Sequence, residues 1–545
     1  MMPDISKMTL REKIGQMFIL RDDRLYNMIP NEEIAEFLKK NPIGGIWATG
    51  RLKKMAATLN FEAASGAGTL DDLKEYIKLL NSNLKIPLLV GGDSEKGGFM
   101  DSSEISGPDA VVATDDASLA YEYGACMARE LAVGGLNWRW SPISDISHHD
   151  SAISVNRVCS DDPEKVVRYS RALIKGTQDN GVAATVKHFP GHDPRETRDS
   201  HFMASINNCS LEEWLETQGK IYKESIEGGA YSVMVGHAAF PAVDDSKIGT
   251  KRRPSTFSKK VITDLLKGQF GFKGVVITDD VGMNSALTVY GRDNKGEMYV
   301  ELINAGNDML LGTPIGENRE DFIGYIENAI KCGRVQEERI NDACERIFDM
   351  KQKLGLFEPE KELEYSLEQA AEKTHAMNTA VARKSLTLLA NDIGLLPCKA
   401  EEIKKVSIIP VTHTPVFKER LQVLKEAFEK RGIPAQIYDT VYQCNLTEAA
   451  KDGLIIYANF VSAHQPAGRC TFFGDVAQQF FKILTVGADK SVVVSFGSPF
   501  IKEEYYEETA TYINAYWYNK ETMEAVCEGI LGELEFEGVS PFRIK

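Results

Sequence analysis

Eight short apolar segments recur between residues 17 and 313, and helix-like stretches separate them. Each segment has the length and composition typical of a buried strand, and the stretches between them, such as residues 116–133 and 211–227, show helical spacing. Strand–helix alternation over roughly 250–300 residues predicts a (β/α)8 barrel, with a doubly wound open sheet as the alternative. The segments are residues 17–20, 44–47, 86–90, 138–142, 183–189, 232–235, 274–278 and 308–311.

A second α/β region is predicted after the barrel. We expect a barrel domain over residues 1–356, a linker and connecting helix over 357–400, with the helix itself over 370–390, and a C-terminal domain over 401–545. Its strands and helices alternate without a fixed repeat, which predicts a smaller doubly wound α/β sandwich. It shows no dense polar cluster, which favours a structural or oligomerisation role.

Composition excludes several classes of partner. The chain has 545 residues and a net charge of −16, which disfavours nucleic acid and anionic membranes as partners. Its nine cysteines form no Cys-x-x-Cys pair, so neither a disulfide framework nor a thiolate zinc site is indicated. There is no signal-peptide pattern at the start and no apolar run of the roughly 18 residues that a membrane span needs. We therefore expect a cytoplasmic protein, whose oligomeric state the sequence leaves open.

Ionisable residues follow five of the eight predicted strands. Active sites of (β/α)8 barrels lie at the C-terminal ends of the strands, so these residues are candidates for chemistry. A single acid after a strand commonly caps the next helix, but capping explains five such positions poorly. The residues are Asp93, Glu95, Asp145, Lys187, His188, His237, Asp279 and Asp280.

The densest group lies in residues 187–201, at the end of the fifth predicted strand and on the loop beyond it. Lys187 and His188 close the strand, and Phe189-Pro190-Gly191 turns the chain. His192, Asp199 and His201 follow on the loop. A surface loop rarely gathers this much imidazole, so the stretch is a candidate active-site segment.

These motifs together resemble the β-N-acetylhexosaminidase branch of glycoside hydrolase family 3. The similarity extends over most of residues 1–355, and its most specific part is the combination of Lys-His-Phe-Pro-Gly-His with Asp-Ser-His. Residues 382–397 also resemble the start of that family's second domain. The motifs are residues 8–17, 187–192, 199–201, 258–262, 274–283 and 305–309.

The resemblance implies a retaining glycosidase. Such an enzyme needs a nucleophile on one face of the anomeric carbon and an acid/base group on the other. Asp279 matches the family nucleophile, which forms a covalent glycosyl-enzyme. His201 matches the acid/base residue, and Asp199 would orient its ring and support the imidazolium. The expected activity is exo-acting hydrolysis of terminal N-acetyl-β-glucosaminides.

The resemblance also assigns residues to sugar binding. Asp93, Arg157, Lys187 and His188 match the family's substrate-binding positions. His192 and His237 are expected to support the site from outside direct contact, and Asp145 is expected to be mainly structural. Neither a metal nor a cofactor is expected, and the expected partner is a small amino-sugar glycoside.

The chain departs from the family pattern at three places. Asp93-Ser94-Glu95 is followed by Lys96 where the family has glycine. The family's Arg-x-Phe-Gly-x-Asp-Pro becomes residues 157–163 with cysteine and serine inside it. Asp193 replaces the glycine that usually follows the second histidine, and the loop to Asp199 is about one residue longer. The predicted nucleophile and the Asp-Ser-His motif remain intact.

Four alternatives stay open. Phosphorolysis is possible, because a neutral histidine base repels an incoming phosphate less than a carboxylate does. A β-glucosidase or β-xylosidase of the same family typically lacks the Asp-Ser-His motif. A metal-dependent amidohydrolase would need an early His-x-His pair, which the sequence lacks. A non-catalytic sugar-binding protein is the last alternative, and simple turnover would exclude it.

Overall fold

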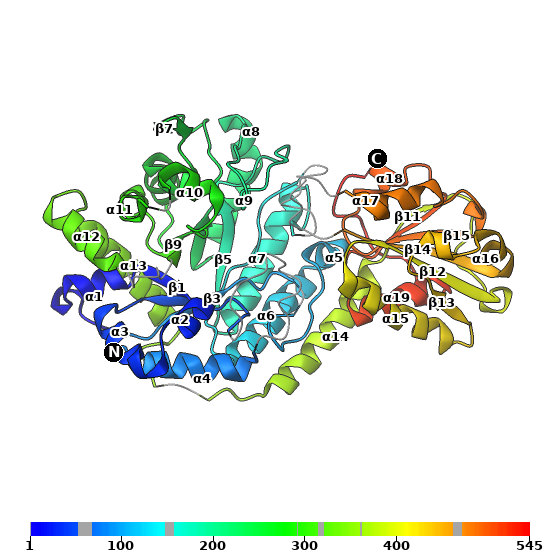
Figure 1. Ribbon diagram of the computed structural model, residues 1–545, viewed down its shortest axis with the longest axis horizontal. Helices are drawn as coiled ribbons and strands as arrows, with labels where there is room; N and C mark the ends of the chain where they lie inside the picture. Colours follow the sequence, from blue (N-terminus) through cyan, green and yellow to red (C-terminus); the bar gives the residue numbers. More distant parts are fainter. Residues whose placement is uncertain are drawn as a thin grey trace. The chain divides into compact units, whose positions relative to one another are not determined.

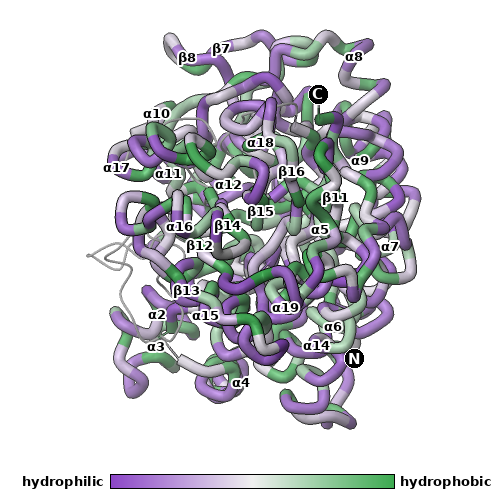
Figure 2. The backbone as a smooth tube through the Cα atoms, turned by 90° about the vertical axis from the view of Figure 1, so that its right-hand side faces the viewer, coloured by the Kyte–Doolittle hydropathy of each residue, from purple (hydrophilic) through white to green (hydrophobic). Residues whose placement is uncertain are grey.

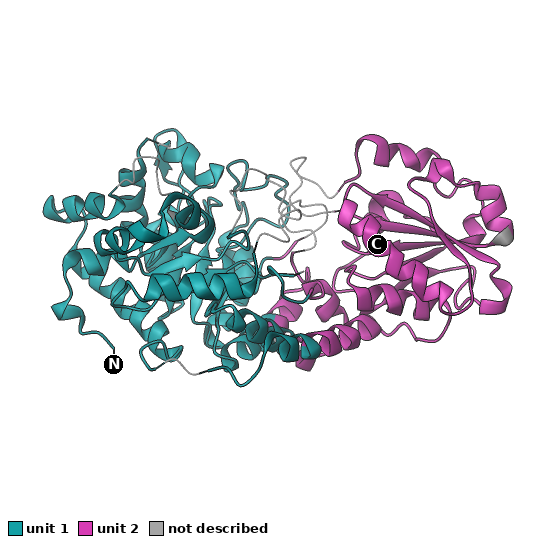
Figure 3. Cartoon of the chain, turned by 60° about the horizontal axis from the view of Figure 1, so that its bottom comes forward, with its two compact units in different colours: residues 1–103, 121–145, 170–373 teal, residues 104–120, 146–169, 374–545 magenta. Residues whose placement is uncertain are grey.

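The computed structural model describes residues 2–52, 68–96, 98–147, 157–291, 293–313, 321–359, 362–461 and 471–544. The chain folds into two compact units, shown in different colours in Figure 3. The first comprises residues 1–103, 121–145 and 170–373, and the second comprises residues 104–120, 146–169 and 374–545. The second unit is therefore built from the C-terminal region together with two segments that interrupt the first.

The first unit contains an eight-stranded parallel sheet in the order β10-β1-β2-β3-β4-β5-β6-β9. Strands β1, β3, β5 and β9 of this sheet are labelled in Figure 1. A parallel bridge between Ile277 and Met309 joins β9 to β10, so that the sheet closes into a barrel. All eight predicted strands and the predicted barrel are confirmed. The strands are β1 (Phe18–Arg21), β2 (Gly45–Trp47), β3 (Leu89–Gly92), β4 (Trp138–Arg139), β5 (Ala183–Phe189), β6 (Ser232–Val235), β9 (Val275–Thr278) and β10 (Leu310–Thr313).

Helices separate the strands, as in other (β/α)8 barrels. The chain forms α1 (Leu10–Gly15), α2 (Asp22–Met28), α3 (Ile34–Lys40), α4 (Leu70–Asn81), α5 (Pro108–Ala113), α6 (Ala117–Val133), α7 (Pro163–Asp179), α8 (Leu211–Glu216), α9 (Gln218–Glu227), η5 (Lys260–Gln269), α10 (Asn284–Tyr290), α11 (Lys295–Ala305), α12 (Phe322–Lys331) and α13 (Glu337–Lys353). A short hydrophilic hairpin, β7 (Lys247–Ile248) and β8 (Lys251–Arg252), follows β6 and is largely purple in Figure 2.

A buried polar contact joins three strands of the barrel. Trp138 is fully buried, and its indole N–H donates to Thr185 Oγ1 at 2.7 Å and to Ser232 Oγ at 2.8 Å. These three residues come from β4, β5 and β6, so the contact joins three neighbouring strands. Buried polar groups that find partners in this way specify one packing arrangement of the core.

The second unit is a six-stranded sheet in the order β11-β16-β15-β14-β12-β13, parallel except for β11. Apolar clusters cover both faces. One packs α15 and α19 against residues such as Val406 and Ile456, and the other packs α16 and α18 against residues such as Ile409 and Tyr457. The predicted doubly wound α/β fold is therefore present. Its elements are α14 (Leu367–Ser385), β11 (Thr387–Asn391), β12 (Lys405–Thr412), α15 (Pro415–Glu429), β13 (Ala435–Ile437), α16 (Leu446–Asp452), β14 (Gly453–Phe460), α17 (Gly474–Gln478), β15 (Ser491–Ser495), α18 (Ile501–Tyr505), β16 (Thr511–Asn514) and α19 (Lys520–Ile530).

Two predicted helices differ from the structure. The helix expected over residues 370–390 ends at Ser385, because residues 387–391 pair antiparallel with β16. Pairing with a distant strand overrides the local helical pattern there. The helix expected over residues 211–227 breaks at Thr217, whose φ and ψ of −116° and −97° are not helical, and forms α8 and α9.

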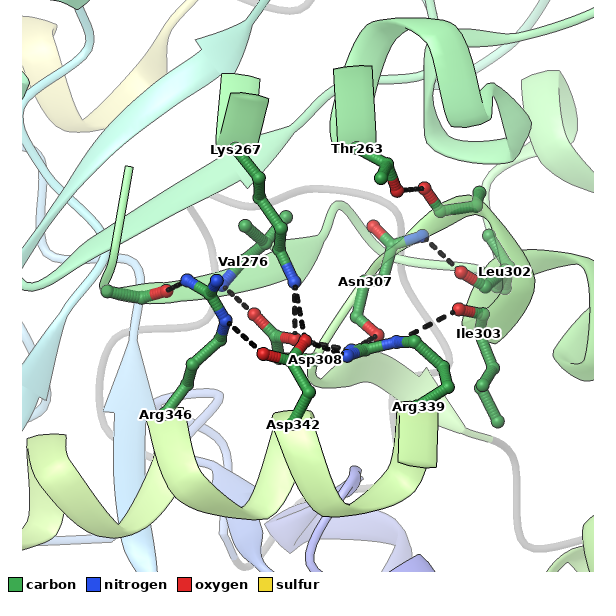
Figure 4. Close-up of polar contacts among 12 residues, drawn as sticks. Thr263, Lys267, Val276, Leu302, Ile303, Asn307, Asp308, Arg339, Asp342 and Arg346 are labelled. Carbon is green, nitrogen blue, oxygen red and sulfur yellow. Dashed lines mark hydrogen bonds and ion pairs between the residues drawn. The ribbon is translucent and has the colours of Figure 1, made fainter. Parts of the chain in front are cut away.

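A dense ionic cluster, which we call the basal cluster, lies where β9 and β10 begin (Figure 4). Asp308 precedes β10 and is fully buried. Its carboxylate accepts from Lys267 Nζ at 2.7 Å, from the Val276 N–H at 2.9 Å and from the guanidinium of Arg339. Asp342, on α13, pairs with Arg339 and with Arg346, the latter at 3.1 Å. The cluster ties α13 to the N-terminal ends of two barrel strands.

Among the described residues, no helix has both the length and the apolar character needed to cross a lipid bilayer.

Candidate active site

Asp279 lies directly after β9, at the C-terminal end of that strand. Its N–H donates to the Val235 carbonyl at 2.9 Å, which extends the β6–β9 pairing by one residue. Its Oδ1 accepts from the N–H of Asp280 at 2.7 Å. The backbone of this carboxylate is therefore held by the barrel, and its side chain is half-buried at the rim.

Three histidines set the electrostatics of Asp279. Burial by itself raises the pKa of this carboxyl. The nearby imidazoles of His188, His237 and His201 and the N–H of Asp280 oppose that effect and lower the pKa to about 2. The structure thus brings three of the predicted site histidines into electrostatic contact with Asp279, which stays ionised at neutral pH.

His201 and Asp199 form a close pair on the loop after β5. Nδ1 of His201 lies 2.6 Å from Asp199 Oδ1, and the His201 N–H donates to the same oxygen at 2.9 Å. Asp199 is 2% exposed, whereas the His201 side chain is 27% exposed. A buried carboxylate therefore holds one ring nitrogen of a partly accessible imidazole, which orients the ring.

Lys187 is buried between two carboxylates. Its Nζ lies 2.7 Å from Asp93 Oδ1 and 2.7 Å from Glu95 Oε1, and its side chain is 1% exposed. The Asp93 side chain is 43% exposed, so it can also accept from a ligand. Glu95 was not among the predicted binding residues, although its Asp-x-Glu spacing after β3 would have placed both carboxylates at the same strand end.

Asp145 organises His188 and His192. Its Oδ2 accepts from the N–H of His188 at 3.3 Å and lies 2.8 Å from the same residue's Nδ1, and its Oδ1 accepts from the His192 N–H at 3.1 Å. Burial raises the pKa of Asp145, but its contact with His188 and the proximity of His192 lower it overall. Asp145 thus contacts both histidine residues, and its mainly structural role stays a prediction.

The same three side chains could in principle hold a cation, because their possible ligand atoms lie within 4.8 Å of one another and all three are buried. Both oxygens of Asp145 are, however, engaged by N–H groups of the two histidine residues. Hydrogen bonds to Asp145 therefore hold the ring of His188 and the backbone of His192.

His237 follows β6 and is fixed through both ring nitrogens. Nδ1 lies 2.8 Å from Thr256 Oγ1, and Nε2 lies 2.9 Å from the carbonyl of Asp280. Burial lowers its pKa, more than the charge of Asp279 raises it. The neutral form is thus favoured, and Nε2 donates its proton to the Asp280 carbonyl. His237 supports the segment that carries Asp279.

Asp280 differs from its neighbour. Burial raises its pKa to about 6, although the Gly282 N–H and the guanidinium groups of Arg21 and Arg24 act in the opposite direction.

Arg157, the remaining predicted binding residue, is buried and belongs to the second unit. Its assignment rests on the sequence motif.

One protein-family model matches this chain. Residues 9–350 match the family model described as the glycosyl hydrolase family 3 N-terminal domain. The matched range contains Asp279, the Asp199–His201 pair and all the predicted binding residues.

Curated relatives include several enzymes that act on amino sugars. A β-N-acetylglucosaminidase/β-glucosidase from Cellulomonas fimi is 28% identical over 414 residues, covering 74% of this chain and 68% of that protein. A β-hexosaminidase from Tolumonas auensis is 30% identical over 305 residues, covering 54% of this chain and 82% of that protein.

Solved structures with the same fold extend the comparison to both units. A β-glucoside phosphorylase, BglX, is 26% identical with a TM-score of 0.82, covering 99% of this chain and 94% of that one. A family 3 β-N-acetylglucosaminidase from Paenibacillus sp. str. FPU-7 is 23% identical with a TM-score of 0.80, covering 98% of this chain and 99% of that one. The latter similarity shows the fold.

Proposed function

Because this chain belongs to glycosyl hydrolase family 3 and is a glycosidase, we propose that it is a retaining, exo-acting β-N-acetylglucosaminidase. The observation that carries the proposal is the pairing of an ionised carboxylate, Asp279, with an imidazole that a buried carboxylate orients, His201 on Asp199. The names of the curated relatives support an amino-sugar substrate.

In the first step, an oxygen of Asp279 attacks the anomeric carbon and the bond from that carbon to the leaving oxygen breaks. A pKa of about 2 keeps Asp279 deprotonated, as a nucleophile must be. His201 gives its proton to the leaving oxygen. The proton moves at Nε2, because Nδ1 is engaged with Asp199.

In the second step, His201 takes a proton from a water molecule, whose oxygen attacks the anomeric carbon. The bond to Asp279 breaks, the carboxylate is released, and the product keeps the β configuration because the centre has been inverted twice. Asp199 stabilises the imidazolium that forms after proton uptake.

Sugar recognition is assigned to the charged groups at the same rim. Asp93 would accept hydrogen bonds from sugar hydroxyls. Lys187, which is paired with both Asp93 and Glu95, would donate hydrogen bonds to them. His188 is held by Asp145 through Nδ1, so Nε2 is its nitrogen for the sugar. For Arg157, a sugar-binding role rests on the sequence motif alone.

Phosphorolysis is the second candidate, and a specific observation favours it. A β-glucoside phosphorylase matches both units of this chain at 26% identity. In that reaction phosphate replaces water in the second step, and the product is a sugar 1-phosphate. Histidine in its neutral form as the base reduces electrostatic repulsion of the incoming dianion compared with a carboxylate base.

A panel of aryl β-glycosides, assayed with and without inorganic phosphate, tests these proposals. We expect N-acetylglucosaminides to be cleaved faster than glucosides and xylosides, with free N-acetylglucosamine as the product in phosphate-free buffer. Sugar 1-phosphate as the main product in phosphate would establish phosphorolysis. Preference for glucosides would reassign the substrate to β-glucosides, and loss of activity in chelator would revive a metal-dependent reaction.

A further inference from the structure

In the loop that carries Asp199 and His201, hydrogen bonds join residues 193–198 on the outgoing side to residues 205–208 on the returning side, and we call this part of the loop the neck. The loop leaves the end of β5 and returns along the segment after β6, where the Asn207 N–H donates to the Ala239 carbonyl at 2.8 Å and the Ala239 N–H donates to the Ser205 carbonyl at 3.0 Å. This loop is also where the sequence departs from the family pattern, by an aspartate in place of glycine and by about one additional residue.

Asp193 bridges the two sides of this neck. Its Oδ1 accepts from the N–H and the Nε of Arg195, both at 2.9 Å, on the outgoing side. Its Oδ2 accepts from the N–H of Asn208 at 2.9 Å on the returning side. The side chain is 4% exposed. Three N–H donors from both sides of the loop thus converge on one buried carboxylate, which makes this bridge specific in its geometry.

Glu196 forms a second bridge closer to the tip. Its Oε1 accepts from the N–H of Arg198 at 3.0 Å, and its Oε2 accepts from the N–H of Ile206 at 3.1 Å. The side chain is 8% exposed. Burial raises the pKa of Glu196, but its bonds to Arg198 and to the Ile206 N–H lower it below the usual value. Glu196 is therefore ionised when it makes this bridge.

The tip beyond the second bridge is joined to α10, the helix that follows Asp279 along the chain. The Asn284 N–H donates to the His201 carbonyl at 3.3 Å, and Asn284 Nδ2 donates to the Phe202 carbonyl at 3.3 Å. Asn284 begins α10, five residues after Asp279. The neck and this contact together fix the loop at both ends of the Asp199–His201 pair.

We propose that Asp193 and Glu196 are positioning residues, which hold the loop so that His201 reaches the leaving oxygen. This inference rests on the proposed function. Neither residue is assigned to the chemistry. Each joins backbone N–H groups from the two sides of the loop, and the side chains of Arg195 and Arg198 are additional donors. Displacing a catalytic group by about 1 Å can cost about 100-fold in rate, so a looser neck should lower the efficiency of proton transfer.

The test is a series of aryl N-acetyl-β-glucosaminides whose leaving groups range from phenol to 2,4-dinitrophenol, measured as kcat/KM. Asp193→Asn places a donor opposite the N–H of Asn208, and Glu196→Gln is the milder second variant. Glu12→Gln is the matched control, because Glu12 accepts from the N–H of Thr9 at 2.9 Å in the capping box of α1, which precedes β1. Thermal unfolding of each variant accompanies the kinetics.

For both loop variants we expect kcat/KM to fall about 10–100-fold with phenol as the leaving group, which needs a proton, and less than about 3-fold with 2,4-dinitrophenol, which does not. Glu12→Gln should leave the whole series unchanged. An equal loss across the series, or none at all, in variants that remain folded would overturn the inference; if Asp193→Asn is unfolded, the Glu196→Gln series decides alone.

His201→Asn, measured in the same series, separates this inference from the proposed function. A steep dependence on the leaving group in His201→Asn but not in the loop variants rejects the positioning role alone. No such dependence in His201→Asn itself rejects histidine as the acid, and with it the proposed function.

Discussion

A carboxylate lies near each end of β9, and the two carboxylates differ in the groups that surround them. At its start, the buried Asp308 accepts from Lys267, Arg339 and the Val276 N–H, so both its oxygens are engaged by donors on three different elements (Figure 4). At its end, Asp279 accepts from one N–H, that of Asp280, and is surrounded by imidazoles, whose charge depends on pH. The N-terminal end of β9 is thus bonded to a saturated carboxylate, that of Asp308, and its C-terminal end leads into the carboxylate that we propose as the nucleophile, that of Asp279.

The difference indicates that the buried carboxylate of Asp308 stabilises the fold, whereas the carboxylate of Asp279 is suited to take part in the reaction. A carboxylate with cations bonded to it has little reactivity and holds its elements together. A carboxylate that is kept ionised mainly by nearby imidazoles retains lone pairs for attack on carbon. Substitutions at the two ends should therefore separate folding from turnover.

The largest effect is expected for Asp279→Ala. Removal of the nucleophile should lower kcat about 10⁴–10⁶-fold while substrate binding and thermal stability persist. Azide added to this variant should restore turnover by attacking the anomeric carbon directly, once, and give the α-glycosyl azide. Turnover near the wild-type level without azide would remove Asp279 from its assigned role.

His201→Ala should have the next largest effect, about 10²–10⁴-fold in kcat for substrates with poor leaving groups. Here azide enters in the second step, after the glycosyl-enzyme has formed, so the product should be the β-glycosyl azide. The configuration of the two azide products, read by NMR, distinguishes the nucleophile from the acid/base. An α product from both variants would contradict the separation of roles.

Asp308→Asn, at the opposite end of the strand, should cost stability instead. Breaking a buried ion-pair network typically costs about 3–5 kcal/mol, because cations are left without their anion. Denaturant unfolding should show this loss, while kcat of the remaining folded enzyme should change little. Full stability in Asp308→Asn would show that the basal cluster does not stabilise the barrel.

A buried lysine on α13, Lys351, can be compared with the two arginines of the same helix. It lies on α13 with Arg339 and Arg346, but its Nζ donates to an amide oxygen, Gln16 Oε1, at 2.7 Å, and burial lowers its pKa to about 7. The unfolded chain has a lysine pKa of about 10.4, so the unfolded state binds the proton more tightly between pH 10 and 7. The native state is therefore penalised progressively as the pH falls through that range.

Lys351→Met should remove this penalty. Its stability relative to wild type should be smallest near pH 10, rise as the pH falls to about 7, and then level off. Lys353→Met is the control, since that side chain is 46% exposed and pairs with Asp349. A stability difference for Lys351→Met that is independent of pH would contradict the lowered pKa. The measurement is urea unfolding at a series of pH values.

The sequence could predict much of this because its signals are local. Short apolar segments separated by helical patterns identified all eight barrel strands, and the motifs placed Asp279, His188 and His201 on elements that the structure brings into electrostatic contact. The parts that it could not predict depend on distant contacts. The end of α14 is set by pairing of β11 with β16, and two segments of the first half of the chain belong to the second unit.

The contacts of the loop neck also could not be predicted from the sequence. Asp193 was recognised as a departure from the family pattern, but its role depends on the N–H of Asn208, fifteen residues later. A carboxylate that accepts from a backbone group at this separation leaves no periodic signal in the sequence. Glu196 likewise carries no signal in the sequence that would predict its contact with Ile206 or the 8% exposure of its side chain.

The most direct test of the central claim is to trap the intermediate. The wild-type enzyme is treated with a 5-fluoro N-acetylglucosaminyl fluoride, which slows the second step, and its peptides are then mapped by mass spectrometry. The account predicts one sugar per chain, attached to the peptide that contains Asp279. Turnover of this reagent with no adduct, or an adduct on a different residue, would contradict it.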